Sequence, residues 1–205
     1  MMHGKILETD FFRRDTVEVA KNLLGKKIIR NISGNFFYAK IVETEAYLGL
    51  NDKACHSYGG KITERNKILY KDGGHIYVYL IYGMYNLLNI VTKSEGEPEA
   101  VLIRAVEPLG NFDGFAINRF GKSYKELSNY QRKNISNGPG KLSLALNIDR
   151  SLNGKILSPD YLYIEDGEKV KNIITSKRIG IDYAEEDADL PLRFYIGNSQ
   201  HISVK

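Results

Sequence analysis

Two stretches of the sequence decide the fold: AKIVETEAYLGLNDKACHSYGG, residues 39–60, and GGHIYVYLIYGMYNLLNI, residues 73–90. The first begins with apolar and polar residues in alternation and ends in glycines, which is typical of a strand followed by a loop. The second has two apolar runs around a glycine-containing turn, which predicts a β-hairpin. We therefore expect a sheet that brings carboxylates, an imidazole, phenols and an amide together.

The composition is that of an ordinary globular protein with an excess of tyrosine. Of the 205 residues, 42% are hydrophobic and 26% are charged, which suits one large domain or two small ones. There are 14 Tyr and no Trp, and Tyr suits half-wet surfaces where a ring stacks and a hydroxyl bonds. The net charge of +4 permits a polyanionic partner but is not a strong electrostatic signature.

Several classes of protein are excluded by simple features of the chain. The single Cys rules out an intrachain disulfide, argues against a cysteine-based zinc site and indicates a reducing compartment. Because charges occur early in the opening residues, we expect no signal peptide. The longest apolar run, residues 76–90, is short and contains four tyrosines, so we expect no membrane span.

The first part of the chain predicts one helix and a pair of strands. Residues 15–24 form the pattern of an amphipathic helix, with Asp15 as its cap and Glu18 completing a capping box. Strands are expected at residues 27–30 and 36–47, on either side of a polar turn.

The longer of these strands carries two carboxylates. A period of two places Ile41, Glu43, Glu45 and Tyr47 on one face. Because buried carboxylates cost free energy, we expect this face to open onto a cleft or water. The pattern alone does not distinguish Glu43 from Glu45, and each could be an ordinary solvated strand residue.

The next part of the chain predicts a short helix followed by the two strands of the hairpin. Thr63 is expected to cap a short helix that runs through residue 69. In the first hairpin strand, residues 76–80, Tyr77 and Tyr79 share the face opposite the aliphatic residues. The return strand is expected at residues 85–92.

The second half predicts further strands with peripheral helices. Arg104 lies inside the apolar run of a strand at residues 99–106, and a buried Arg requires a carboxylate. Residues 109–134 fit two short helices or a long ordered loop, and Pro139 opens a helix through residue 146. Shorter strands are expected at residues 161–164, 193–196 and 201–204. The fold class is therefore α+β, with a largely antiparallel sheet.

Seven segments, in this order along the chain, resemble the alkyladenine (3-methyladenine) DNA glycosylase family. They are VETEAYLG (42–49), ACHSYGG (54–60), TERN (63–66), YVYLIYGMYNLLNI (77–90), VLIRAVEPL (101–109), SNGPGKL (136–142) and PLRFYI (191–196). The resemblance implies a single domain over residues 1–205, with a curved, largely antiparallel sheet and peripheral helices. It also implies a monofunctional enzyme of base excision repair. Such an enzyme flips alkylated or deaminated purines out of duplex DNA and hydrolyses the N-glycosidic bond, leaving an abasic site.

The resemblance gives individual residues their roles. It makes Glu45 the water-activating carboxylate, Arg104 its support and Tyr82 the wedge that intercalates into DNA. The base pocket is expected to contain Tyr47, Ala54, His56, Tyr79 and Asn89. The contacts to the DNA backbone are expected from Lys61, Thr63, Arg65, Met84 and Lys141. No metal and no cofactor are implied.

Other interpretations of the same residues remain open at this point. His56 on its own suits a loop histidine, the strand tyrosines suit plain sheet positions, and Lys61 and Lys141 suit a surface. A non-catalytic nucleic-acid-binding module would use the tyrosines for stacking but gives Glu45 no role. A hydrolase of free nucleosides would need neither Tyr82 nor a basic face.

The expected partner is double-stranded DNA that contains damaged purines, bound by a monomer without any membrane. The protein is expected in the cytoplasm with the nucleoid in a prokaryote, or in the nucleus in a eukaryote. No lysine is among the residues assigned to catalysis or to the base pocket, so we expect an abasic site in an unbroken strand, because strand cleavage by a lyase needs an amine nucleophile.

Overall fold

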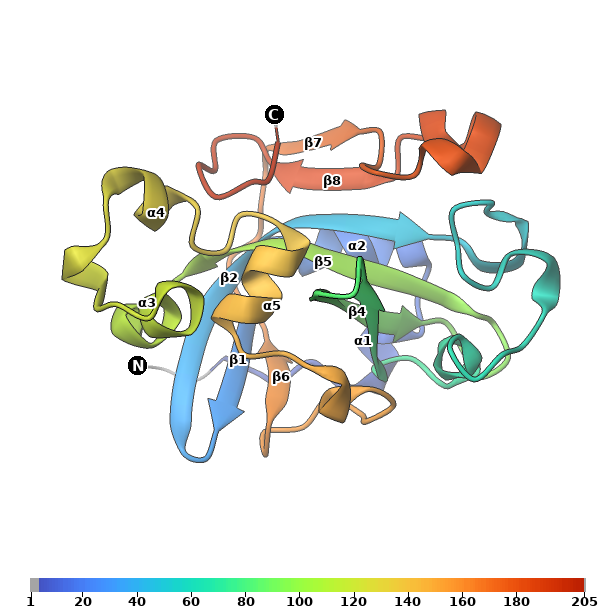
Figure 1. The fold of residues 1–205 in the computed structure, drawn as a ribbon. Coiled ribbons are helices and arrows are strands. Elements are labelled where there is room, and N and C mark those ends of the chain that lie inside the picture. Colours follow the sequence, from blue (N-terminus) through green and yellow to red (C-terminus); the bar gives the residue numbers. More distant parts are fainter. Residues whose placement is uncertain (1–3, 205) are drawn as a thin grey trace.

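The computed structural model describes residues 4–204 and is organised around one curled antiparallel sheet (Figure 1). The strand order is β3-β4-β5-β2-β1-β6, and β8 pairs with both β2 and β7. The strands are β1 (Lys27–Ile32), β2 (Asn35–Tyr47), β3 (Ile76–Ile81), β4 (Tyr85–Thr92), β5 (Glu99–Pro108), β6 (Leu162–Glu165), β7 (Ile173–Ser176) and β8 (Arg193–Ile196). The expected α+β fold with a curved, antiparallel sheet is confirmed.

β2 is the strand that the others surround. Its first half pairs with β1 and its second half with β8, while β5 lies along its other edge. The register with β5 shifts between Ile41 and Thr44, which is a β-bulge. Both Ile41 and Val42 pack into the main core as a result. The prediction that Ile41 shares the face of Glu43 is therefore wrong, because the bulge breaks the period of two.

The helices are short and lie around the sheet. They are α1 (Thr9–Phe12), α2 (Thr16–Leu23), α3 (Phe112–Phe120), α4 (Asn129–Lys133) and α5 (Pro139–Ala145). The carboxylate of Asp15 accepts a hydrogen bond from the N–H of Glu18, which confirms the predicted cap of α2. α2 packs on β2, and α5 packs on β4 and β5. The region 109–134 contains the two helices α3 and α4, which agrees with the expectation of two short helices and not with that of a long ordered loop.

One local prediction holds in part and one is wrong. The short helix before the hairpin is a 3-10 helix, Lys67–Tyr70, and its N-cap position is Asn66. Thr63 caps the turn just before it: its hydroxyl accepts the Asn66 N–H at 3.3 Å, and the Asn66 side chain accepts the Thr63 N–H at 2.7 Å. Residues 201–204 form no strand. The backbone N–H of Ser203 binds a carboxylate oxygen of Glu43 at 2.6 Å, so this segment pairs with a buried charge and not with a neighbouring strand.

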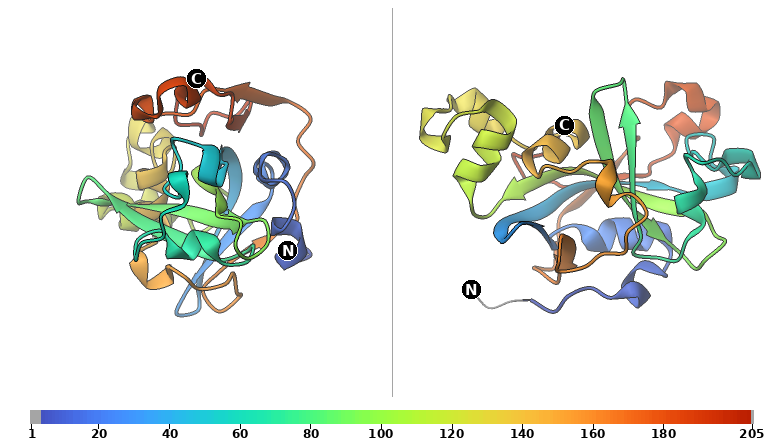
Figure 2. Two further views of the ribbon diagram at one scale, coloured as in Figure 1. Left: turned by 90° about the vertical axis from the view of Figure 1, so that its right-hand side faces the viewer. Right: turned by 60° about the horizontal axis from the view of Figure 1, so that its bottom comes forward.

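The β3–β4 hairpin projects from the rest of the molecule, as both views in Figure 2 show. Its aliphatic residues Ile76 and Val78 lie in the main core, whereas Tyr77 and Tyr79 belong to a separate cluster on the other face, as predicted. At the tip, Tyr82 and Gly83 both have positive φ, 53° and 68°. Tyr82 is 79% exposed, so the tip presents an aromatic ring to solvent.

Candidate active site

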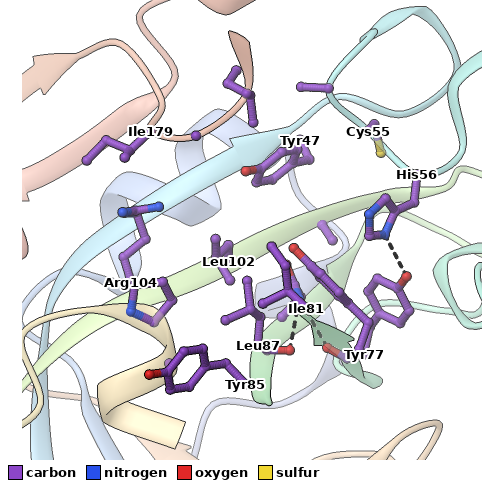
Figure 3. Close-up of a pocket in the computed structure, with 18 of the residues that line it drawn as sticks. Tyr47, Cys55, His56, Tyr77, Ile81, Tyr85, Leu87, Leu102, Arg104 and Ile179 are labelled. Carbon is purple, nitrogen blue, oxygen red and sulfur yellow. Dashed lines mark hydrogen bonds between the residues drawn. The ribbon is translucent and has the colours of Figure 1, made fainter. Parts of the chain in front are cut away.

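A cavity of about 710 Å³ opens between the hairpin, the end of β2, the loop that follows β2, and residues 179–183. Its size is typical of a site for a small organic group. Figure 3 shows Tyr47 of β2, His56 of the following loop and Tyr77 of β3 around this space. Many of the residues singled out from the sequence line the cavity, namely Tyr47, Ala54, His56, Arg65, Tyr79, Tyr82, Asn89 and Arg104.

Glu45 lies directly behind the wall of the cavity and is fully buried. Its Oε1 accepts the backbone N–H of Ile179 at 2.8 Å and lies 3.1 Å from Arg104 Nη1. Its Oε2 accepts the hydroxyl of Tyr47 at 2.9 Å. Ile179, Arg104 and Tyr47 all line the cavity, but Glu45 itself does not. The Glu45 carboxylate is thus separated from the cavity by these three residues, each of which contacts both the carboxylate and the cavity.

Glu43 is equally buried but belongs to a different environment. Its Oε1 accepts from Arg104 Nε at 2.9 Å, Arg193 Nε at 2.8 Å and the hydroxyl of Ser203 at 2.7 Å. Neither Arg193 nor Ser203 lines the cavity. The prediction that the carboxylate face opens onto water or a cleft is therefore wrong for Glu43, which arginines on β5 and β8 and the C-terminal segment cover. At the other end of the same face, Tyr47 lines the cavity.

The pKa values of the two carboxylates are displaced in opposite directions. Burial raises the pKa of Glu45 above its ordinary value, and Arg104, Ile179 and Tyr47 only partly oppose that effect. Burial also acts on Glu43, but Arg104, Ser203 and Arg193 outweigh it and lower the pKa of Glu43. Neighbouring titratable groups whose environments displace their pKa values in opposite directions mark a candidate functional site.

In the aromatic part of the cavity, a neutral histidine, His56, contacts two tyrosines. The His56 and Tyr79 rings meet edge to face with centroids 4.5 Å apart, and His56 Nδ1 lies 2.8 Å from the Tyr77 hydroxyl. Burial, with a contribution from Arg65, lowers the pKa of His56 to about 4. Arg65 can only donate, so its contact with Nε2 at 3.4 Å leaves the single ring proton on Nδ1, which donates to Tyr77.

Asn89 is buried in β4 with its amide orientation fixed. Its Nδ2 donates to the backbone carbonyls of Tyr77 and Leu87, at 3.2 and 3.3 Å. Arg104, in the adjacent strand β5, has the carboxylate partner predicted for an Arg in an apolar strand, and it has two of them, Glu43 and Glu45. The ladder between β4 and β5 pairs Asn89 with Leu102, so Asn89 and Arg104 lie near each other at the same cavity.

The residues expected to contact the DNA backbone are dispersed. Lys61, Thr63, Met84 and Lys141 lie outside the cavity lining, and the first three are exposed. Arg65, by contrast, lies over the Tyr79 ring at 5.4 Å and lines the cavity. Lys141 is half-buried and already donates to Asn134 and Asn137, at 2.8 and 3.0 Å. Burial, and the nearby Arg119, lower the pKa of Lys141.

Sequence reasoning missed one whole wall of the cavity. Ile179, Gly180, Ile181 and Tyr183 line it, and the preceding Arg178 forms a buried ion pair with Asp52. Nothing in this stretch of sequence forms a periodic pattern that would have drawn attention to it. Arg193 carried a usable signal, since it lies in an apolar strand as Arg104 does and also binds Glu43.

Two absences hold for the described part of the chain, residues 4–204. Over that range no cluster of three or more His, Cys, Asp or Glu side chains is arranged to hold a metal ion. Within the same limits no helix has both the length and the apolar character needed to cross a membrane.

Comparison with known proteins identifies the family. The family model for methylpurine-DNA glycosylase matches residues 10–200. A relative from Clostridium novyi, provisionally named 3-methyladenine DNA glycosylase, is 55% identical over 201 residues that cover 98% of this chain and all of its own. A relative from Clostridioides difficile has the same provisional name and is 55% identical; the match covers 93% of this chain and all of the relative. Another, from Desulfitobacterium hafniense, is 50% identical, and the match covers 98% of this chain and all of the relative. The chain thus belongs to the methylpurine-DNA glycosylase family, and is a DNA glycosylase, a hydrolase of N-glycosyl bonds whose partner is DNA.

Proposed function

We propose that this enzyme is a monofunctional glycosylase that extrudes alkylated and deaminated purines from duplex DNA and releases them by hydrolysis, leaving an abasic site. The observation that carries the proposal is that every group bound to Glu45 also lines the cavity. A base held in that cavity would have its sugar close to a carboxylate of raised pKa. The provisional names of the relatives point to the same class of lesion.

Extrusion comes first, because the bond to be cleaved is inaccessible within the duplex. Unstacking costs a few kcal/mol, and a side chain that fills the gap offsets part of that cost. Tyr82 suits this role, since it is exposed at the tip of a projecting hairpin. A non-glycine residue at φ 53° also costs about 1–3 kcal/mol, which supports a functional reason for an aromatic at this position.

Recognition would use the aromatic part of the cavity. Alkylation at N3 or N7 makes a purine cationic, and aromatic faces attract cations. Tyr47, His56 and Tyr79 could contact such a base, with Ala54 leaving room beside them. Because the pKa of His56 is about 4, the ring is neutral at physiological pH and does not repel a cationic purine. Asn89, fixed on its strand, would discriminate among purines at the inner end.

Bond cleavage gives an oxocarbenium-like sugar, as in other glycoside hydrolyses. Glu45 would stabilise that positive charge and accept a proton from the attacking water. Arg104 would hold the carboxylate in place through its contact with Oε1. The hydroxyl of Tyr47 already occupies Oε2, so the water would have to share or replace that hydrogen bond. The raised pKa of Glu45 makes it a better proton acceptor than an exposed carboxylate.

Release without strand cleavage is consistent with the described cavity lining, which provides no amine nucleophile. Of the described residues that line the cavity, none is a lysine. Outside the cavity, Lys61, Thr63 and Met84 are exposed and could contact the backbone, whereas Lys141 would need to bind phosphate in addition to its two asparagines. We further propose that residues 1–205 act as one domain and as a monomer, in the compartment that holds the chromosome.

An excision panel tests this function. Duplexes that each contain one 3-methyladenine analogue, 7-methylguanine or hypoxanthine are incubated with the enzyme, and half of each sample is then treated with alkali. We expect strand breaks only after alkali, which reveals abasic sites in intact strands. Breaks without alkali would indicate a lyase. Release of base from free nucleosides but not from duplex would contradict the proposal and favour a nucleoside hydrolase.

A further inference from the structure

A second buried ion pair lies beside the active site and has no role in the mechanism above. Arg178 Nη1 and Nη2 donate to Asp52 Oδ2 and Oδ1, at 2.5 and 2.8 Å. The two side chains are 0% and 2% exposed. A buried pair pays a desolvation penalty that well-packed apolar residues would avoid, so its presence is not explained by stability alone.

The pair joins two segments of the cavity wall to the same strand. Asp52 accepts the N–H groups of Leu48 and Ala54, at 2.9 and 3.0 Å, which fixes the loop that leaves β2. Arg178 donates to the carbonyls of Ala46 in β2 and of Asp187, both at 3.1 Å. The segment that follows β7 is therefore attached to the end of β2 through one guanidinium.

Two of the three donors to Glu45 depend on that guanidinium. Ile179, whose N–H binds Glu45 Oε1, is the next residue after Arg178. The guanidinium carbon of Arg178 also lies 4.9 Å from the ring centroid of Tyr47, whose hydroxyl binds Glu45 Oε2. A movement of Arg178 would therefore displace hydrogen-bond donors at both carboxylate oxygens.

We propose that Arg178 and Asp52 are positioning residues, which hold the Ile179 N–H and the Tyr47 hydroxyl on the Glu45 carboxylate. This inference rests on the proposed role of Glu45. It also predicts an electrostatic effect, because both donors and the charge of Arg178 favour the ionised carboxylate. The other charged or titratable groups that face Glu45 are Arg104 from β5, Glu43 from β2 and Tyr79 from β3.

The test compares single-turnover excision, DNA affinity and the pH–rate profile. The main variant is the double substitution Arg178→Met with Asp52→Asn, which removes both charges so that neither is left buried alone. We expect excision at neutral pH to fall about 10- to 100-fold, as small misplacements of catalytic groups do. The affinity for lesion-bearing duplex should stay close to wild type. The acidic limb of the profile should move to higher pH, because the pKa of Glu45 rises.

This shift separates positioning from mere loss of folded protein, which lowers the rate equally at every pH. Lys177→Met is the matched control: it removes the neighbouring cation, whose only ion pair described in residues 4–204 is an exposed one with Asp189, and should behave as wild type. Arg178→Lys keeps the charge but loses the bidentate geometry. It should lower the plateau rate while leaving the acidic limb closer to wild type than the double variant does.

The inference is overturned if the folded double variant, checked by circular dichroism, has a wild-type rate and an unmoved acidic limb. It is also overturned if the defect lies entirely in DNA affinity, since the pair would then serve binding. A wild-type plateau for Arg178→Lys would refute the geometric part even where the double variant does not fold. Wild-type excision by Glu45→Gln would instead refute the proposed role of Glu45, whatever the Arg178 variants do.

Discussion

The hydroxyl of Tyr47 donates a hydrogen bond to Oε2 of Glu45 at 2.9 Å. Because the ring of Tyr47 lines the cavity, this contact joins the side chain proposed to stack on the base to the carboxylate proposed to activate water. The remaining oxygen of Glu45 is held by Arg104 and Ile179. The carboxylate is therefore ordered before any substrate arrives, and its proton affinity depends on these three partners.

Tyr47→Phe removes the hydroxyl and keeps the stacking ring. The hydrogen bond lowers the pKa of Glu45, so its loss should raise that pKa further. Under the proposed role of Glu45, excision requires the ionised form, so the rate would rise as pH increases through this pKa, and the acidic limb should lie at higher pH in the variant. Single-turnover rates between pH 5 and 9 measure the shift. An unmoved limb, or one at lower pH, would show that the hydroxyl does not control Glu45.

Glu43→Gln should affect stability first. The pKa of Glu43 is lowered in the folded state, so its carboxylate contributes stability that is present above its ordinary pKa and lost as pH falls through the folded-state value. Breaking a buried pair costs about 3–5 kcal/mol, since Arg104 and Arg193 lose a shared partner. Urea unfolding at pH 7 should show this loss, and the difference from wild type should shrink in strong acid.

Glu64→Gln provides the control for that measurement, because Glu64 is exposed and paired only within its own turn to Lys67. Its free energy of unfolding should match that of wild type. If Glu43→Gln were as stable as this control at pH 7, the buried network around Glu43 would not have the structural role assigned to it.

Asn89→Ser should relax the choice of purine. Asn89 lines the cavity with its Nδ2 fixed by two backbone carbonyls, so its amide occupies a defined volume. The exocyclic 2-amino group of guanine would crowd that volume, and a smaller side chain removes the clash. Competition between duplexes that contain 7-methylguanine and 3-methyladenine analogues should show a relative gain for guanine. An unchanged ratio would count against a discriminating role for Asn89.

Tyr82→Ala should weaken binding to lesion-bearing duplex, since stacking of an aromatic side chain on a base is worth ~1–3 kcal/mol. Tyr82→Phe keeps the ring and should be nearly silent, and single-stranded substrates, which need no wedge, should reveal a smaller defect. Tyr130 is a matched control, being equally exposed but on α4. Equal defects in Tyr82→Phe and Tyr82→Ala, or in Tyr130→Ala, would remove the case for intercalation.

The sequence predicts most of the sheet but not how the carboxylates are covered. Alternation and turn residues predict the hairpin, with Tyr77 and Tyr79 on the face away from the core, because such signals are local. The bulge in β2 is not visible as a pattern, and it moves Ile41 into the core. Two further partners of Glu43, Arg193 of β8 and Ser203 of the C-terminal segment, are more than a hundred residues away, and although an Arg in an apolar strand indicates a buried carboxylate, no local signal says which one.

The candidate site, too, could be predicted from the sequence only in part. Arg104 could be predicted to have a carboxylate partner because an Arg inside an apolar strand requires one. The contact of Ile179 with Glu45 is made by a backbone N–H, which any residue could provide, so the side chain at that position gives no clue. Lys141 stays a prediction: the resemblance places it at the DNA backbone, and in the structure its ammonium group already donates to two asparagine side chains.

The most direct test of the account is single-turnover excision by Glu45→Gln on a duplex that it still binds. The amide is isosteric but cannot accept a proton from water, so the rate should fall ~10²–10⁴-fold with DNA affinity near wild type. Burial raises the pKa of Glu45, so replacing the charge should also leave the folded state no less stable at pH 7. Near-normal excision by Glu45→Gln, with Glu43→Gln folded but inactive, would show that the other carboxylate does the chemistry.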